Sequence, residues 1–396
     1  MRAAVPDYVG ASFADCPPGH LFGLYFPVWK DDWMIEKDQK SAALKQTLAL
    51  PPHTQETLAA LRDRQTLLLD ALPEAARLSI EAQSTAPFAT GLGMEHPLEN
   101  GFAFLNPYGL AYLPGSSIKG VLRRAAEELL PSPAGGRGAG GEGACWTEEA
   151  ITALFGLESE DRQKEHTRGA LTFWDALPKP AKNSMGMEVM TPHYGDYYKG
   201  ESTPHDSGQP IPIVFLVVPE GAAFSFHLTC DTRRLPEPLS ASWQDLMHVA
   251  FEHAFDWLGF GAKTAVGYGA MKWDDQREAT VRKEREERAS QALQAVEAKR
   301  LDEEKKAARA GMSPVERAIQ EFLDARLDKN APEISAVIGA VKQGHMAEHK
   351  VAVAEWLRAR MQAEKGQWKE TSQAKKPDKD REYQNTSLVM RWLRGE

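Results

Sequence analysis

The sequence predicts an α+β protein, because strand-like and helix-like patterns alternate over its first two thirds and only helical patterns follow. Apolar and polar residues alternate at 77–84, as in a half-buried strand, and apolar residues recur at helical spacing over 117–130. Further strand patterns, a second helix and a last strand follow by residue 273. The order strand, helix, strands, helix, strand is that of the split βαβ, or ferredoxin-like, arrangement, which is also the topology of the RNA-recognition module (RRM).

Helical elements are expected before this core. Residues 20–34 are rich in aromatic residues and are expected to be extended, whereas residues 41–72 have a helical pattern that Pro51 and Pro52 break. We therefore assign residues 1–76 to an N-terminal extension that contains an extended segment and helices.

The core is expected to cover residues 77–274. Its other strands are predicted at Gly169–Asp175, Met185–Met190, Pro212–Val218, Ala222–Thr229 and Val266–Trp273, and its other helices at Thr147–Phe155 and Trp243–Leu258. Two segments lack a regular pattern. Residues 131–144 are so rich in glycine and proline that we expect a flexible insertion, and residues 191–211 are expected to form a long loop.

The composition changes after Asp274. Residues 275–312 are almost purely charged, which is typical of a solvated single helix or a partly disordered linker. Amphipathic spacing then returns and predicts an α-helical C-terminal appendix over 313–396. Its helices are expected at Ser313–Leu327, Pro332–Val341, Ala347–Met361 and Tyr383–Leu393.

The composition also limits the class of protein. Cys16, Cys145 and Cys230 are too few and too far apart for a disulfide framework or a C-x-x-C metal site, so a reducing compartment is expected. The N-terminus lacks an apolar signal region, and the longest aliphatic run, 213–218, is too short to span a bilayer. We expect a cytoplasmic protein without a membrane partner.

The formal net charge of −9 is unevenly distributed. From residue 276 onward, 25 Lys and Arg face 21 Asp and Glu, so this part carries +4 and the preceding body −13. An acidic body repels a polyanion through its general field. Any nucleic acid must therefore bind in a local groove or patch where the few basic residues are concentrated.

The first candidate motif is the segment 112–130, which predicts a turn that opens a helix. Pro114 and Gly115 form the turn, and Ser116 or Ser117 is the expected N-cap. The charges of the helix oppose its dipole, because the bases come early and the acids late. These charged residues are Lys119, Arg123, Arg124, Glu127 and Glu128. The pattern suits an external phosphate at the helix N-terminus, and the alternative is a set of ordinary solvated charges.

The second motif is a glycine loop over 258–269, with Gly259, Gly261, Gly267 and Gly269. A Walker A loop is excluded because Ala262 separates the glycine from Lys263, and a dinucleotide fingerprint because the order is helix, turn, strand. We favour a loop whose backbone approaches a ligand closely, with Lys263 as a point charge. The alternative is a simple connector that Gly259 caps.

The third motif is the irregular segment 190–200, where tyrosines alternate with basic residues. Such residues can stack on bases and neutralise phosphates. The candidates are His193, Tyr194, Tyr197, Tyr198 and Lys199. Alternatively, the tyrosines pack the loop onto the body and His193 only forms hydrogen bonds.

Signals for metal binding and catalysis are weak. His345 and His349 have the spacing of a zincin helix, but no Glu follows the first His, so we expect a surface face. No Ser or Cys has a recognisable nucleophile signature. We expect no metal and no cofactor.

Together, 114–123, 190–198, 210–216 and 259–269 resemble the RAMP proteins of CRISPR systems, in particular the sixth-subunit family of the type III-B (Cmr) effector complex. The resemblance covers roughly residues 77–274. It implies a ferredoxin-like RAMP core at the end of the backbone filament, near the 3′ part of the guide RNA (crRNA). It implies a non-catalytic role in antiviral RNA interference, with other Cmr RAMP subunits and guide RNA as partners and contact with target RNA left open.

The resemblance also implies which residues contact RNA. Cations of the first motif would grip guide-RNA phosphates, and Lys263 and the glycine loop would line the same groove. The expected RNA-binding residues are Gly115, Ser116, Ser117, Lys119, Arg123, Arg124, His193, Tyr194, Tyr197, Lys199, Gly259, Gly261, Lys263 and Gly267.

Two other functions remain open. The chain could be a metal-independent endoribonuclease that processes guide precursors, with His193 and Tyr194 as acid and base. It could also be a scaffold whose appendix recruits another protein. The resemblance supplies nothing for residues 276–396.

Overall fold

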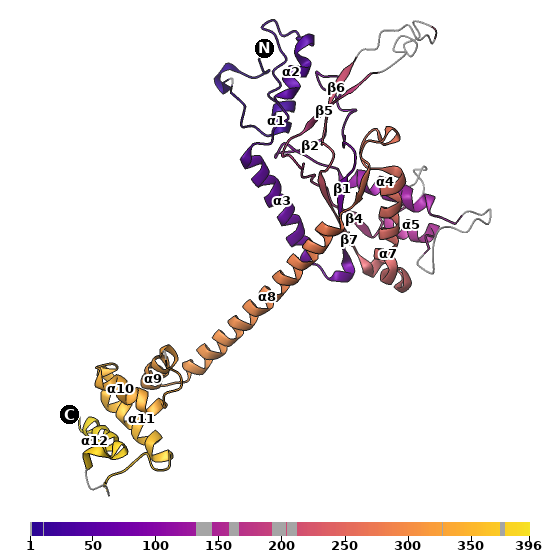
Figure 1. Ribbon diagram of the computed structural model, residues 1–396. Helices are drawn as coiled ribbons and strands as arrows, with labels where there is room; N and C mark the ends of the chain where they lie inside the picture. Colours follow the sequence, from indigo (N-terminus) through magenta and orange to yellow (C-terminus); the bar gives the residue numbers. More distant parts are fainter. Residues whose placement is uncertain are drawn as a thin grey trace. The chain divides into compact units, whose positions relative to one another are not determined.

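A computed structural model describes residues 2–10, 12–131, 145–157, 166–191, 203, 212–326, 328–372 and 377–396 (Figure 1). The chain divides into two compact units, residues 1–285 and 286–396. Each unit has a hydrophobic core of its own. No helix in the ranges above is long and apolar enough to cross a membrane.

A four-stranded antiparallel sheet organises the first unit. Its strands are β1 (Arg77–Ser84), β4 (Leu171–Phe173), β7 (Ala223–Cys230) and β8 (Met271–Trp273), in the order β4-β7-β1-β8. The longest pairing joins β1 and β7, from Arg77 opposite Thr229 to Gln83 opposite Ala223. Helix α4 (Gly115–Glu128) lies in the chain between β1 and β4, and helix α7 (Glu237–His253) between β7 and β8.

One face of this sheet is apolar. Ile80 of β1 lies opposite Phe226 of β7, and both side chains are fully buried. They share a core with Leu122 of α4, Phe251 of α7 and Phe155 of α5 (Glu148–Phe155). In Figure 1 the sheet lies between α3 (Pro52–Asp70) and the group of α4, α5 and α7. Alternation along β1 and β7 thus directs every second side chain towards these three helices.

The opposite face carries a buried polar network. Ser79 lies opposite His227 and Glu81 opposite Ser225, and both Glu81 and His227 are only 3% exposed. The Ser225 hydroxyl donates to Glu81 Oε2 over 2.7 Å, and Ser79 Oγ lies 3.2 Å from His227 Nδ1. Burial raises the pKa of Glu81. Burial, and then the nearby guanidinium groups, lowers the pKa of His227 to about 3.

Two guanidinium groups close over this network. Arg62 of α3 donates to the carbonyls of Leu177 and Ala223 and to the Ser225 hydroxyl. Arg285 forms an ion pair with Asp70 at 2.7 Å. This ion pair therefore connects the first part of α8 (Asp275–Ala310) to the end of α3, next to the polar face of the sheet.

The N-terminal part is more helical than expected. Helix α1 (Pro18–Gly23) occupies the start of the segment that we expected to be extended, because prolines 17 and 18 set the backbone for a helix N-terminus. Helix α2 (Lys40–Lys45) follows, and α3 begins at Pro52. A short hairpin of β2 (Phe104–Leu105) and β3 (Leu110–Ala111) was not expected at all.

The end of the core also differs from expectation. Helix α7 continues into a π-helical turn, η5 (Ala254–Leu258), and the glycine loop contains a 3₁₀ turn, η6 (Thr264–Val266). Strand β8 covers only Met271–Trp273, although a strand from Val266 was expected. Gly267 and Gly269 have φ values of 93° and 69°, which no strand accommodates.

The second unit is entirely helical in its described residues. It contains α9 (Pro314–Ala325), α10 (Glu333–Lys342), α11 (Lys350–Ala363) and α12 (Arg381–Leu393). Their shared core includes Leu323, Val337, Leu357 and Trp392. A capping box starts α9, in which Ser313 and Glu316 exchange side-chain and backbone hydrogen bonds.

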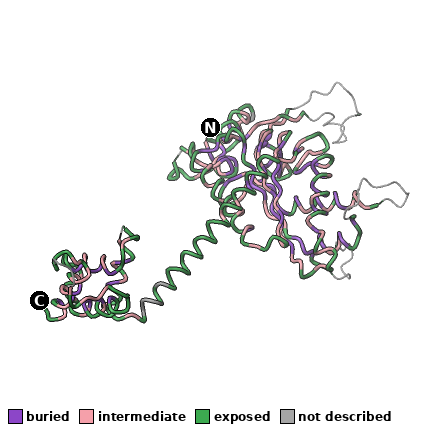
Figure 2. Tube along the Cα trace, turned by 60° about the horizontal axis from the view of Figure 1, so that its bottom comes forward, coloured by how far each residue is buried: buried purple, intermediate pink, exposed green. Residues whose placement is uncertain are grey.

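Helix α8 spans the whole of Asp275–Ala310, so the charged segment forms the single helix that was one of its two expected states. Val281 is buried in the first unit. Residues 289–304 are exposed at every position (Figure 2). Local ion pairs such as Arg300–Glu297 and Lys306–Asp302 support this stretch.

Candidate nucleic-acid interface

The N-terminus of α4 already holds an anionic group. The helix begins at Gly115 with Pro114 as its N-cap, so the expected capping by Ser116 or Ser117 is wrong. Instead the Gly115 N–H donates to Asp175 Oδ1 over 2.8 Å. A carboxylate at a helix N-terminus is favourable. A Cβ at Gly115 would overlap the Phe173 carbonyl, so this glycine allows the helix to start against the end of β4.

The two arginines of α4 have partners on their own helix. Arg123 forms an ion pair with Glu127 at 3.0 Å and donates to the Gly156 carbonyl. Arg124 forms an ion pair with Glu128 at 2.8 Å. Because each acid lies four residues after its base, these pairs account for the late position of the acids without a ligand.

Glu128 and Lys119 differ in their surroundings. A hydrogen bond from His253 and one from Arg124 hold the pKa of Glu128 below its usual range. Lys119, one turn before Arg123, is half-buried and forms no hydrogen bond or ion pair with any residue of the described ranges. Of the three cations of α4, Lys119 is therefore the one whose charge is not already matched.

Three glycines of the glycine loop lie against backbone carbonyls of the protein itself. The Gly259 N–H donates to the Ala254 carbonyl and caps η5. A Cβ at Gly261 would overlap the Ala89 carbonyl, and one at Gly269 would overlap the Phe260 carbonyl. These three glycines are explained by packing within the protein. Gly267 differs, because no atom lies within 4 Å of the position of its Cβ.

Lys263 lies beside a second hairpin, at the end where the first strand stops and the second begins. This hairpin pairs β5 (Gly186–Met190) with β6 (Ile213–Val217), and Met190 is opposite Ile213. The Lys263 ammonium lies 4.0 Å from Met190 Sδ and 5.9 Å from the centre of the Phe215 ring. The second motif and the start of the third are thus neighbours, although some 70 residues separate them in the sequence.

The remaining candidates fall on residues outside the described ranges. His193, Tyr194, Tyr197 and Lys199 follow directly after Thr191, where the described part of this segment ends. Their predicted roles in binding or catalysis therefore stay predictions. Within the described ranges, no group of three or more His, Cys, Asp or Glu residues could hold a metal ion.

Two exposed apolar residues beside the loop were missed. Trp257 of η5 is 78% exposed and Val266 of η6 is 69% exposed. The sequence pattern treats 243–258 as one regular helix. A π-helical turn changes the phase of the helix, so an apolar residue that the pattern assigns to the core can face solvent. The signal that could have revealed this surface in the sequence is a tryptophan directly before a glycine-rich loop.

Helix α4 and the glycine loop belong to one neighbourhood. Glu128 at the end of α4 contacts His253 at the end of α7, and α4 also packs against η5. Lys119 lies nine residues before Glu128, which is roughly 13 Å along a helix. That Lys119 and Lys263 line one groove stays a prediction.

Comparisons with known proteins find relatives for part of the first unit. Residues 81–272 match the sequence model of the RAMP superfamily. Over 284 residues the chain is 27% identical to the CRISPR system Cmr subunit Cmr6 of Pyrococcus furiosus, covering 60% of this chain and 78% of that protein. It is 26% identical over 176 residues to the Cmr6 subunit of Saccharolobus solfataricus, covering 44% of this chain and 49% of that protein.

Solved structures give matches of the same kind. The crystal structure of Cmr6 from Pyrococcus furiosus has a TM-score of 0.30 and 25% identity, covering 50% of this chain and 98% of that one. A chain of the type III-B Cmr-beta complex bound to cognate target RNA has a TM-score of 0.40 and 19% identity, covering 60% and 71%.

Proposed function

The chain belongs to the RAMP superfamily through residues 81–272, and from this premise we propose that it is a subunit of a type III-B CRISPR effector complex. Its relatives in Pyrococcus and Saccharolobus are Cmr6 subunits. We propose further that it binds guide RNA without cleaving it, next to other RAMP subunits, and that its sheet is the ferredoxin-like core of the family.

The chain order and the sheet order support that core. The elements follow one another as β1, α4, β4, β7, α7 and β8, and the strands lie in the order β4-β7-β1-β8. A split βαβ unit places the third strand between the first two and adds the fourth on the other side of the first.

The observation that carries the RNA-binding proposal is the position of Lys263 beside the end of β5. The ammonium contacts a thioether and an aromatic ring rather than a carboxylate. Its charge is therefore available at the point where the tyrosine-rich segment begins. A guide-dependent complex reads sequence by base pairing, so its protein needs only phosphate and shape contacts. A few local cations on an acidic body meet that requirement.

The test compares two double variants of the full chain. Lys119→Gln with Lys263→Gln is expected to weaken guide-RNA binding about tenfold at 0.1 M salt. The slope of log K against log salt should fall by about 1.4, because each phosphate contact with a single strand contributes about 0.7. The measurement is fluorescence anisotropy with labelled guide RNA over a salt series.

The matched control is Lys45→Gln with Lys182→Gln, which removes the same charge from two exposed lysines elsewhere in the first unit. Equal binding by both double variants would contradict the proposal. The endoribonuclease alternative is tested with the same protein and repeat RNA in EDTA, where site-specific cutting would replace the non-catalytic role.

A further inference from the structure

The second unit has a basic hollow between two of its helices. The hollow has a volume of about 340 Å³ and lies between α10 and the segment formed by η8 (Pro377–Lys379) and the start of α12. Its lining residues are Ser335, Ile338, Gly339, Lys342, Asp378, Lys379, Arg381, Gln384 and Asn385. The RAMP match ends at residue 272, so this feature lies outside the matched residues.

Three of the lining side chains are cations without a matching acid. Lys342, Lys379 and Arg381 are exposed and form no ion pair with any residue that the structure describes. The one acid in the lining, Asp378, forms none either, so the lining carries a formal charge of +2. The charge comes from both walls, because Lys342 belongs to α10 and the other two cations to the opposite segment.

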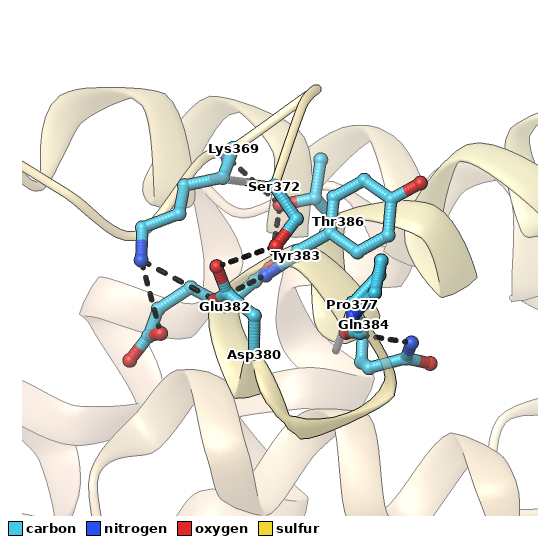
Figure 3. Close-up of polar contacts among 8 residues, drawn as sticks. All are labelled: Lys369, Ser372, Pro377, Asp380, Glu382, Tyr383, Gln384 and Thr386. Carbon is cyan, nitrogen blue, oxygen red and sulfur yellow. Dashed lines mark hydrogen bonds and ion pairs between the residues drawn. The ribbon is translucent and has the colours of Figure 1, made fainter. Parts of the chain in front are cut away.

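The acids next to Arg381 are engaged elsewhere. Lys369 forms ion pairs with Asp380 and Glu382, each at 3.3 Å (Figure 3). Asp380 also accepts hydrogen bonds from the Tyr383 N–H and the Ser372 hydroxyl. The Tyr383 N–H holds the pKa of Asp380 below its usual range, and the hydrogen bond from Lys369 to Glu382 raises the pKa of Lys369. Arg381, between these two acids in the sequence, is left to face the hollow.

The hollow also offers neutral donors and space. The side chains of Ser335 and Asn385 add a hydroxyl and an amide group to its lining, and Gln384 adds a second amide, which also donates to the Pro377 carbonyl over 3.3 Å. Gly339 lies in α10, and no atom lies within 4 Å of the position of its Cβ. An apolar side chain at 339 would therefore project into open space without disturbing the core.

We propose that this hollow binds a phosphate group, supplied by the backbone of a single-stranded RNA or by a free nucleotide. A phosphate presents several acceptor oxygens around one centre, so donors from two walls can reach it together, and a guanidinium matches two of those oxygens. A planar carboxylate presents only two. The proposal concerns α10, η8 and the start of α12 and does not depend on the interface of the first unit.

The experiment uses the full chain with Lys119→Gln and Lys263→Gln as background, so that the first unit does not dominate binding. Into it are placed the site variant Lys342→Gln/Lys379→Gln/Arg381→Gln or the control Arg317→Gln/Arg358→Gln/Lys365→Gln. The control removes the same charge from exposed residues of the same unit that do not line the hollow. The probe is a fluorescein-labelled oligouridylate, with inorganic phosphate and uridine monophosphate as competitors.

The site variant should bind the oligouridylate about tenfold more weakly than the control, with a salt slope lower by about 2. Gly339→Leu should weaken binding as well while all charges remain, and a thermal melt checks that the helix is intact. Mapped 4-thiouridine crosslinks should fall at 333–342 and 377–385. Competition by uridine monophosphate but not by phosphate would point to a nucleotide, and competition by neither would point to the strand.

Three results would overturn the proposal. One is equal loss of binding in the site and control variants, because that would mean that RNA is attracted by the overall positive charge and not by this hollow. Another is unchanged binding in Gly339→Leu with the fold retained. The third is displacement of RNA by an acidic peptide more readily than by any phosphate compound. The first unit's test uses different residues and a different control, so either proposal can fail alone.

Discussion

Strands β1 and β7 contribute to both faces of the four-stranded sheet, but one face is stabilised by apolar packing and the other by a polar network. Towards α4 and α7, Ile80, Phe224 and Phe226 pack without a polar atom. Towards α3, Glu81 and His227 are just as buried but hold a hydrogen-bonded network. The apolar face gains from area removed from water, in any geometry that packs well. The polar face is stable only if every partner is in place.

This difference explains how α3 finds its position. Apolar burial is non-directional, whereas Arg62 reaches two carbonyls and a hydroxyl only in one arrangement. The polar face therefore adds directional bonds between α3 and the sheet, beside the buried apolar contacts of residues such as Leu58. We expect the apolar face to contribute more to stability. Substitutions on the two faces should accordingly differ in size and in additivity.

The largest effect is expected from Phe226→Ala. Phe226 is fully buried and its ring centre lies 5.0 Å from that of Phe260 and 5.3 Å from that of Phe251. Removing it should lower the free energy of unfolding by about 3–5 kcal/mol, since a cavity is left in the aromatic cluster. Urea titration measures this, with Phe226→Leu as the milder control. A loss below about 1 kcal/mol would show that the apolar face is not the main source of stability.

A smaller and non-additive effect is expected on the polar face. Arg62→Met should cost about 3 kcal/mol, because it removes the hydrogen bonds to the Leu177 carbonyl and the Ser225 hydroxyl and the positive charge near the buried Glu81. The double variant with Glu81→Leu should cost at least 1 kcal/mol less than the sum of the single changes. Strict additivity in this double-mutant cycle would mean that the network is not coupled.

The smallest effect depends on pH. His227 has a folded pKa of about 3, far below its unfolded value of about 6.5, so the unfolded state takes up a proton first as the pH falls. Stability should therefore be lost from pH 6.5 downward, by about 1 kcal/mol between pH 6.5 and 5.5. Glu81, whose pKa is raised, acts in the opposite direction at lower pH.

His227→Asn should remove the loss of stability between pH 6.5 and 5.5 that comes from His227, and leave the contributions of other groups unchanged. The quantity to compare is the shift in urea midpoint between pH 6.5 and 5.5 in each of the two proteins, because contributions from all other groups cancel in that comparison. An identical shift in both would show that His227 takes up its proton in the folded state as easily as in the unfolded one.

Local periodicity predicted most of the elements but not their surroundings. The strand at 77–84 was placed correctly, because its alternation is strict. The same alternation suggested a face towards solvent at Ser79 and Glu81, and it could not show that the preceding α-helix folds back so that Arg62 bonds to this face. The hairpin of β2 and β3 was missed because two-residue strands have no period to detect.

The candidate interface shows a similar division. The spacing of Arg123 and Glu127, and of Arg124 and Glu128, was visible in the sequence and already allowed i,i+4 ion pairs. The contact of Lys263 with Met190 could not be foreseen, since it depends on how a hairpin and a loop meet. Nor could the sequence show whether a glycine leaves space for a ligand or for a backbone carbonyl of the protein itself.

The crowding at Gly269 has a consequence for the history of this loop. Every replacement of glycine by another L-amino acid adds a Cβ, and here that atom would overlap the Phe260 carbonyl. Selection for folding alone would thus keep this glycine in descendants that had lost any ligand. Retention of Gly269 among homologues would therefore report on chain packing. Gly267 borders open space, but its φ of 93° also favours glycine, so its retention would report on the backbone conformation of the loop.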